Sequence, residues 1–117
     1  MNLRIDRDRL LASLDELARI GATAGGGVTR LALSDEDKAG RDLLARWMTG
    51  AGLDVRVDDF GNMTGVRAGR SEAPPVLLAS HIDTVVRGGR YDGALGVLGA
   101  LEVVRTLNDH EVETEKP

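Results

Sequence analysis

The chain has 117 residues and a formal net charge of −4, and its 42% hydrophobic and 29% charged residues are typical of a soluble, single-domain globular protein. The acidic balance without any basic cluster argues against a nucleic-acid surface, and the absence of cysteine excludes disulfides and thiolate metal sites. No run is apolar for long enough to span a bilayer, and residues 1–11 alternate arginine and aspartate rather than forming a signal core, so we expect a cytoplasmic protein without a membrane partner.

Two amphipathic helices are predicted in the first half of the chain. Leucines recur at helical spacing within residues 6–20, and Gly21 ends that helix. Ser34 is a typical N-cap residue followed by three acidic residues, so a second helix is predicted from there to about Ala51. Both apolar stripes are interpreted as faces that pack in the core.

A hairpin, a strand and a third helix follow. Residues 53–58 alternate apolar and charged side chains, residues 59–62 have turn chemistry, and residues 63–67 complete a predicted β-hairpin. The apolar run at residues 76–79 follows two prolines and predicts a central strand that is buried on both faces. A helix is predicted over residues 93–107, where small apolar residues suit close packing on a sheet.

Polar side chains come directly after that central strand. His81 and Asp83 are two residues apart, so in an extended chain they project to the same side. Asp92 follows a glycine pair and precedes the third helix, whose N-terminus favours a carboxylate. Imidazole and carboxylate are ligands for divalent cations, and Asp83 is placed either to ligate or to orient His81. The alternative is a histidine satisfied at a strand end and an aspartate that simply caps a helix.

This region resembles a known group of enzymes. The sequences SHIDTV at residues 80–85 and GGRYDGALGV at residues 88–97 are similar to the dinuclear-metal amidohydrolases related to the M20 peptidases. The short path from His81 to Asp92 points to the branch of N-carbamoyl-L-amino-acid hydrolase, β-ureidopropionase and allantoate amidohydrolase. The resemblance also covers three other stretches, at residues 28–31, 34–40 and 59–62.

The resemblance implies a site and a reaction. His81 would be a ligand of one metal ion, Asp92 would bridge two, and Asp83 would be a catalytic residue that supports His81. The complete enzyme would use two divalent metal ions (Zn, Mn, Co or Ni) and metal-activated water to hydrolyse a C–N bond in a small ureido acid, either an N-carbamoyl amino acid or allantoate. It would be a homodimer.

Other parts of the family pattern lie outside this sequence. The family's adjacent Glu-Glu pair, which supplies the general base, does not occur here, and two family histidines and the lid domain that mediates dimerisation are also absent. His110 matches neither histidine, and the polar tail around it is interpreted as solvated. We therefore expect residues 1–117 to be the N-terminal portion of the catalytic domain and to be inactive alone. The alternative is a truncated, inactive chain that acts as a binding or interaction module through exposed apolar faces.

The expected fold is α/β, a partial three-layer sandwich with a mixed sheet, forming the N-terminal part of a zinc-exopeptidase-like catalytic domain. A parallel strand after the third helix would complete a right-handed crossover. Thr29, Arg30 and Ser34 fall in a matched stretch, and two roles stay open for them: lining the active-site cleft or anchoring a loop.

Overall fold

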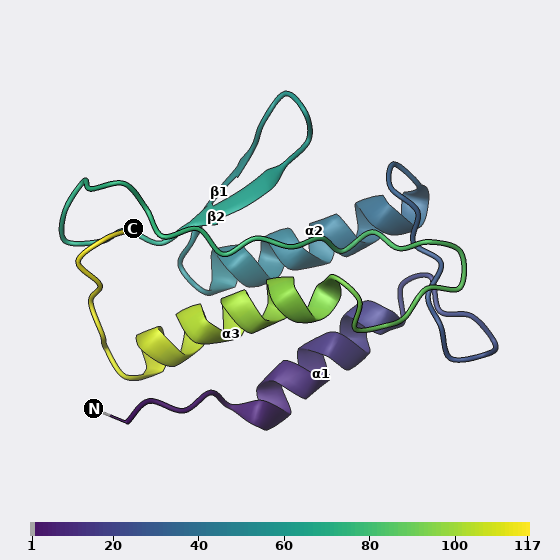
Figure 1. The fold of residues 1–117 in the computed structure, drawn as a ribbon, viewed down its shortest axis with the longest axis horizontal. Coiled ribbons are helices and arrows are strands. Elements are labelled where there is room, and N and C mark those ends of the chain that lie inside the picture. Colours follow the sequence, from purple (N-terminus) through teal and green to yellow (C-terminus); the bar gives the residue numbers. More distant parts are fainter. Residues whose placement is uncertain (1) are drawn as a thin grey trace.

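The computed structural model describes residues 2–117 and contains three helices and a two-stranded sheet (Figure 1). In chain order the elements are α1 (Arg7–Ala18), α2 (Asp35–Gly50), β1 (Asp54–Val57), β2 (Met63–Val66) and α3 (Ala94–Asp109). The three predicted helices and the predicted hairpin are therefore confirmed, with ends that agree within two residues. Among the described residues, no helix is both long and apolar enough to cross a membrane.

Side-chain caps fix the start of the first two helices. The carboxylate of Asp6 accepts a hydrogen bond from the amide of Arg9 at 3.0 Å, and the hydroxyl of Ser34 accepts one from the amide of Asp37 at 3.1 Å. Such caps satisfy amides that have no partner within the helix. The predicted cap at Ser34 is confirmed, whereas α3 begins after Gly93 without a side-chain cap.

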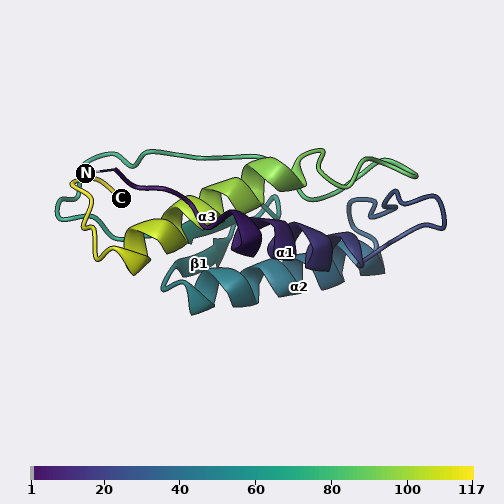
Figure 2. The same ribbon diagram turned by 90° about the horizontal axis from the view of Figure 1, so that it is seen from below.

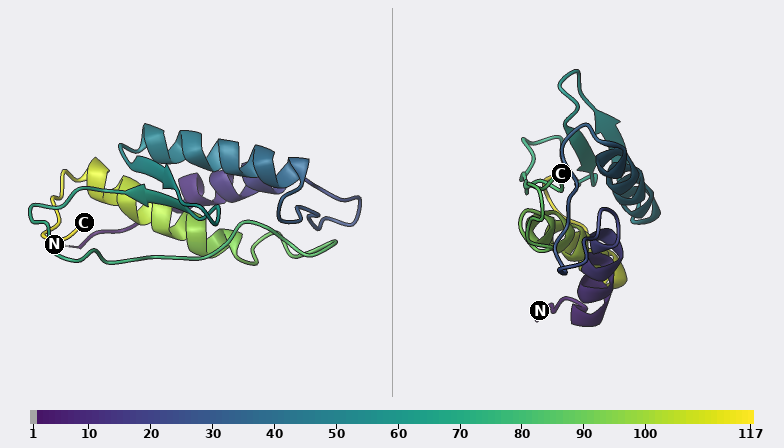
Figure 3. Two further views of the ribbon diagram at one scale, coloured as in Figure 1. Left: turned by 90° about the horizontal axis from the view of Figure 1, so that it is seen from above. Right: turned by 90° about the vertical axis from the view of Figure 1, so that its right-hand side faces the viewer.

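The hairpin is antiparallel, with Asp54 opposite Val66, and it projects beyond the helices on the side of α2 (Figure 3). Asp58 organises its turn. One carboxylate oxygen accepts from the amides of Phe60 and Asn62, each at 2.9 Å, and the other accepts from the side-chain amide of Asn62 at 2.8 Å. These hydrogen bonds hold the pKa of Asp58 below its ordinary value, and the Asn62 side chain contributes most.

The core lies among the three helices and the segment that precedes α3 (Figure 2). Its members are the apolar residues that the helical stripes predict, together with Ile82: Leu14, Leu17, Leu43, Leu44, Ile82, Ala94, Leu98 and Leu101. Removing one such side chain from water contributes about 1.5–3 kcal/mol. The core therefore accounts for the way α1 and α3 pack against each other.

An ion pair between a partly exposed arginine and a buried glutamate joins the start of α1 to α3. Glu102 is completely buried, and its carboxylate accepts from Nη2 of Arg9 at 2.7 Å and from Nε at 3.0 Å. The amide of Asp6 donates to the same carboxylate at 3.1 Å. The hydrogen bonds of Arg9 to Glu102 and to Asp109 raise its pKa above the already high ordinary value. Glu102 thus stabilises the packing of α1 against α3.

The predicted central strand at residues 76–79 is not formed in the structure. Residues 76–80 are extended and run alongside α3, but they pair with no other strand in the described chain (Figures 1 and 2). Val76, Leu77 and Leu78 are 69%, 74% and 57% exposed, so the expectation of a strand buried on both faces is wrong for this chain. An apolar run becomes a buried strand only where neighbouring strands and covering layers are present. The sheet of the described residues is accordingly two-stranded and antiparallel rather than mixed.

The tail after α3 is ordered by backbone hydrogen bonds. The amides of Arg70 and Ser71 donate to the carbonyls of Thr114 and Glu115 at 2.9 and 3.0 Å. Farther along, the amide of Val76 donates to the carbonyl of Pro117 at 2.9 Å. Residues 114–117 therefore run in the same direction as residues 70–76, beside the beginning of the exposed extended segment.

Candidate metal-binding site

Alternation along the extended segment presents two polar side chains together. Ile82 and Thr84 are 8% and 9% exposed and face the interior, whereas the side chains of His81 and Asp83 are 51% and 46% exposed. The ring nitrogen Nδ1 of His81 lies 3.5 Å from the Oδ1 atom of Asp83. The structure thus places the two side chains on one side of the chain, as their spacing predicts.

The ring of His81 is oriented by the backbone two residues away. Its Nδ1 atom lies 2.9 Å from the carbonyl oxygen of Asp83. Because a carbonyl oxygen only accepts, Nδ1 carries the proton in this contact, and the lone pair is then on Nε2. A histidine whose Nδ1–H is held by a carbonyl is the usual arrangement of a metal-binding imidazole. The chemistry of His81 therefore fits a divalent cation.

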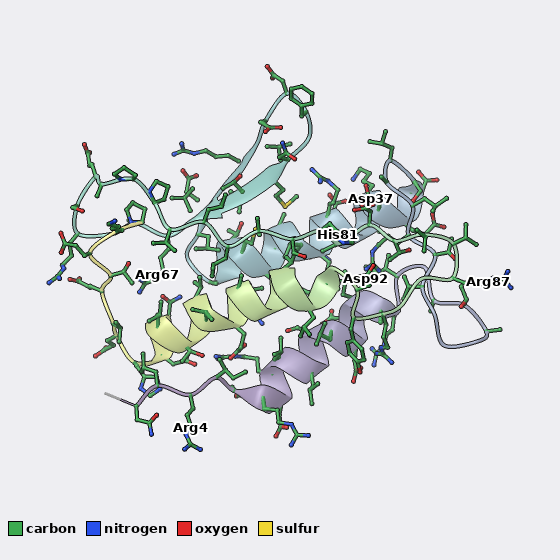
Figure 4. All side chains as sticks on the ribbon, in the orientation of Figure 1. Arg4, Asp37, Arg67, His81, Arg87 and Asp92 are labelled. Carbon is green, nitrogen blue, oxygen red and sulfur yellow. The ribbon has the colours of Figure 1, made fainter. Side chains whose placement is uncertain are left out.

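Asp92 lies at the same end of α3 as His81 (Figure 4). It precedes the helix by two positions, and its backbone carbonyl accepts from the amide of Ala94 at 2.8 Å. Its carboxylate makes no cap on the helix and has no hydrogen-bond partner among the described residues. The alternative in which Asp92 simply caps the helix is therefore wrong, and its oxygens remain available for a cation.

Ser80, Gly93 and Gly96 connect His81 to the start of α3. A Cβ atom at Gly93 would stand 2.4 Å from Cε1 of His81, so the ring rests directly on this glycine. The hydroxyl of Ser80 donates to the carbonyl of Gly93 at 2.9 Å, and a Cβ at Gly96 would stand 2.7 Å from Ser80. The signal in the sequence was the pair of glycines three residues apart, Gly93 as the N-cap of α3 and Gly96 in its first turn.

The matched stretch at residues 28–31 anchors the loop between His81 and Asp92. Arg30 is 1% exposed, so anchoring rather than lining a cleft is its role, and burial lowers its pKa from the ordinary value. The Oγ1 atom of Thr29 accepts from the amide of Arg87 at 2.8 Å. Val28 and Gly88 exchange two backbone hydrogen bonds, of 2.9 and 2.8 Å. Together these contacts hold the loop that connects His81 to Asp92.

Two hollows among the described residues are lined by residues other than His81, Asp83 and Asp92. A hollow of about 280 Å³ lies between the end of α1 and the start of α2 and is lined by Gly21, Ala22, Thr23, Thr29, Leu31, Ser34 and Glu36. A second, of about 510 Å³, lies between the three helices and includes Trp47, Arg46 and Arg105. Thr29 and Ser34 thus border the first hollow, which is separate from His81, Asp83 and Asp92. His81, Asp83 and Asp92 instead lie on an open surface.

The chain brings together only part of a metal-binding set. Within residues 2–117, no group of three or more His, Asp or Glu side chains is arranged to hold a metal ion. His110 is the C-cap of α3, at the opposite end of that helix from Asp92, so it does not join the site. The donors that are present, an imidazole nitrogen and carboxylate oxygens, suit zinc, manganese, cobalt or nickel.

Comparison with known proteins finds relatives that are named as amidohydrolases. The chain is 46% identical over 117 residues to an N-carbamoyl-L-amino-acid amidohydrolase of Rhizobium meliloti, a match that covers 99% of this chain and 28% of that protein. It is 41% identical over 97 residues to the allantoate amidohydrolase of Bacillus subtilis, covering 82% of this chain and 24% of that enzyme. No family model matches the chain.

A solved structure agrees with these sequences. A hydantoinase/carbamoylase family amidase from Burkholderia ambifaria superposes with a TM-score of 0.96 and 56% identity, over 97% of this chain and 28% of that one. The chain therefore spans about 28% of the length of these relatives. Over that span, its homologues are N-carbamoyl-L-amino-acid and allantoate amidohydrolases by sequence and a hydantoinase/carbamoylase family amidase by fold.

Proposed function

We propose that this chain supplies the first metal ligands of an amidohydrolase. The observation that carries the proposal is that His81, with Nε2 free, and Asp92, with an uncapped carboxylate, lie at one end of α3. This arrangement occurs in a chain that is 46% identical to an N-carbamoyl-L-amino-acid amidohydrolase. His81 and Asp92 are the residues that would hold the metal, with Asp92 shared between two divalent ions (Zn, Mn, Co or Ni).

Asp83 is proposed as the residue that prepares His81. Its carbonyl holds the Nδ1 proton of His81 at 2.9 Å, and its carboxylate adds negative charge 3.5 Å from the same nitrogen. Both contacts keep the lone pair on Nε2 and make the imidazole a better donor. Bound divalent ions would lower the pKa of a water molecule and polarise the scissile carbonyl group.

The proposed reaction is hydrolysis of a C–N bond in a small ureido acid. The names of the relatives support either an N-carbamoyl amino acid or allantoate as the substrate. For the complete enzyme we propose a cytoplasmic homodimer whose catalytic domain is a three-layer sandwich. The parallel course of residues 114–117 beside residues 70–76 supports a larger sheet in that domain. We expect the 117-residue chain alone to be inactive, because fewer than three ligand groups meet at the site.

Paramagnetic NMR of the chain tests the metal site. Mn²⁺ added to the ¹⁵N-labelled protein should broaden the amide signals around His81 and Asp92 first. His81→Ala and Asp92→Asn should each remove this broadening. His110→Ala is the matched control, because it removes the chain's other histidine from the far end of α3, and it should change nothing. Broadening centred on residues 109–115, or equal broadening in all variants, would contradict the proposal.

A chimaera tests the reaction. The matching segment of the Rhizobium meliloti amidohydrolase is replaced by this chain, and ammonia release from N-carbamoyl amino acids and from allantoate is measured. We expect hydrolysis of one of the two substrate classes, and its loss in the His81→Ala and Asp92→Asn versions. An active chimaera that tolerates both substitutions would exclude these residues as ligands.

A second candidate function is favoured by one observation. The exposed apolar run at residues 76–78 offers a strand edge to another polypeptide, which fits a catalytically inactive interaction module. Such a module would associate through this run whether or not His81 and Asp92 are intact. Association that disappears in the His81→Ala variant would argue against it.

A further inference from the structure

Arg30 is a buried cation whose guanidinium group is hydrogen-bonded to backbone carbonyls. Its Nη1 atom donates to the carbonyls of Leu17 and Ile20, at 2.9 and 2.8 Å, and the negative charges of Asp37 and Asp83 also favour its charged form. These carbonyls lie at the end of α1, where the helix dipole places partial negative charge. The end of α1 therefore fixes the position of the guanidinium group.

The same residue holds the chain on both sides of Asp83. The Nε atom of Arg30 donates to the carbonyl of Ile82 at 2.8 Å. The amide of Arg30 donates to Oγ1 of Thr84 at 2.8 Å, and the amide of Thr84 donates back to the carbonyl of Arg30 at 2.7 Å. Three hydrogen bonds thus set the register in which Ile82 and Thr84 face inward. A slip of one residue would turn His81 and Asp83 inward instead.

The second helix leaves room for the guanidinium group. A Cβ atom at Gly40, which is buried in α2, would stand 3.0 Å from Cδ of Arg30 and 3.4 Å from its Nε. A methyl group there would press on the side chain without changing its charge. Gly40 therefore offers a way to displace Arg30 while keeping the residue.

We propose that Arg30 is a positioning residue for His81 and Asp83. By holding Ile82 and Thr84 in register against the end of α1, it presents the imidazole and the carboxylate on the side where Asp92 lies. That this placement serves metal binding rests on the proposed function. Arg30 acts through the backbone of its neighbours and would touch neither metal nor substrate.

NMR of the metal-free chain tests the geometry directly. The variants are Arg30→Lys, whose single ammonium group lacks the planar fork that reaches several carbonyls, and Gly40→Ala. The readout is the nuclear Overhauser contact between the ring of His81 and the Hα atoms of Gly93, together with hydrogen exchange of the Thr84 amide. We expect both variants to weaken the contact and to speed exchange at Thr84 at least tenfold relative to amides of α2.

The control is a destabilising change far from the site. Glu102→Gln disturbs the ion pair between α1 and α3 and should lower the melting temperature while it leaves the contact between His81 and Gly93 intact. If Arg30→Lys behaves like this control, or if Arg30→Lys is unfolded and Gly40→Ala keeps the native contact, Arg30 is only a stability residue and the proposal is overturned.

Titration with Mn²⁺ links the geometry to ligand binding. Arg30→Lys should require at least tenfold more Mn²⁺ than the wild type to broaden the signals of His81 and Asp92, the usual effect of losing a residue that orients a ligand. Equal Mn²⁺ affinity in both proteins would overturn the positioning role. Absence of broadening in the wild type, with the contact between His81 and Gly93 still dependent on Arg30, would overturn the proposed metal site and leave the positioning role standing.

Discussion

The imidazole ring of His81 rests on the backbone of Gly93, so closely that a Cβ atom at Gly93 would stand 2.4 Å from Cε1 and 2.5 Å from Nδ1 of the ring. Gly93 also has a positive φ of 71°, which residues other than glycine rarely adopt. One residue thus allows both the turn into α3 and the position of the histidine beside Asp92.

Gly93→Ala should therefore destabilise the protein and displace the ring. Backbone strain and the forced contact together should lower the free energy of unfolding by about 3 kcal/mol, as measured by urea denaturation. Gly26→Ala is the matched control, because Gly26 also has a positive φ, of 86°, but nothing lies within 4 Å of the position that its Cβ atom would take. The control should lose only the strain part, about 1 kcal/mol. Equal losses in both variants would show that the contact with His81 has no energetic weight.

The ion pair between Arg9 and Glu102 should be a major determinant of stability. Arg9→Ala leaves a completely buried carboxylate without its main partner and should lower the free energy of unfolding by about 3 kcal/mol. Arg56→Ala, which breaks an exposed pair with Asp54, should cost less than about 1 kcal/mol. Urea denaturation measures both, and similar values for the two variants would contradict the prediction.

The turn of the hairpin should respond to acid through Asp58. Because hydrogen bonds from Asn62 hold the pKa of Asp58 below its ordinary value, the charged form stabilises the turn at higher pH, and this contribution is lost as the pH falls through the lowered pKa. Asn62→Ala should raise the pKa of Asp58 towards its ordinary value in a ¹³C NMR titration. Phe60→Ala keeps its backbone donor and should leave the titration of Asp58 unchanged. A titration of Asp58 that ignores Asn62→Ala would refute this account.

The exposed run at residues 76–78 should promote self-association. Leu77→Lys should weaken this association and so lower the weight-average sedimentation coefficient of the protein. Because Leu77 is mostly exposed, the free energy of unfolding should change by less than about 0.5 kcal/mol. Leu33→Lys is the control, since Leu33 is exposed but lies outside the run, and it should leave association unchanged. Association that is equal in the wild type and both variants would exclude this surface.

Local patterns in the sequence were sufficient for the regular elements and for part of the site. The leucine stripes, the cap at Ser34 and the alternation in the first strand of the hairpin each depend on residues a few positions apart, and the structure confirms them. The placement of His81 and Asp83 on one side of the chain follows from their spacing of two for the same reason. The same reasoning overestimated the burial of residues 76–79, because burial of a strand depends on neighbouring strands that a local pattern does not contain.

By itself, the sequence determined the helices, the hairpin, the resemblance to the amidohydrolases and the identity of His81, Asp83 and Asp92 as candidate ligands. Only the tertiary structure decided how these residues are held: Arg30 meets Ile82 across 52 positions of sequence, and Arg9 meets Glu102 across 93. An arginine or a glutamate looks like a surface residue in a local pattern. Its burial is set by donors and acceptors that come together only when the helices pack, because a buried charge is stable only where such partners surround it.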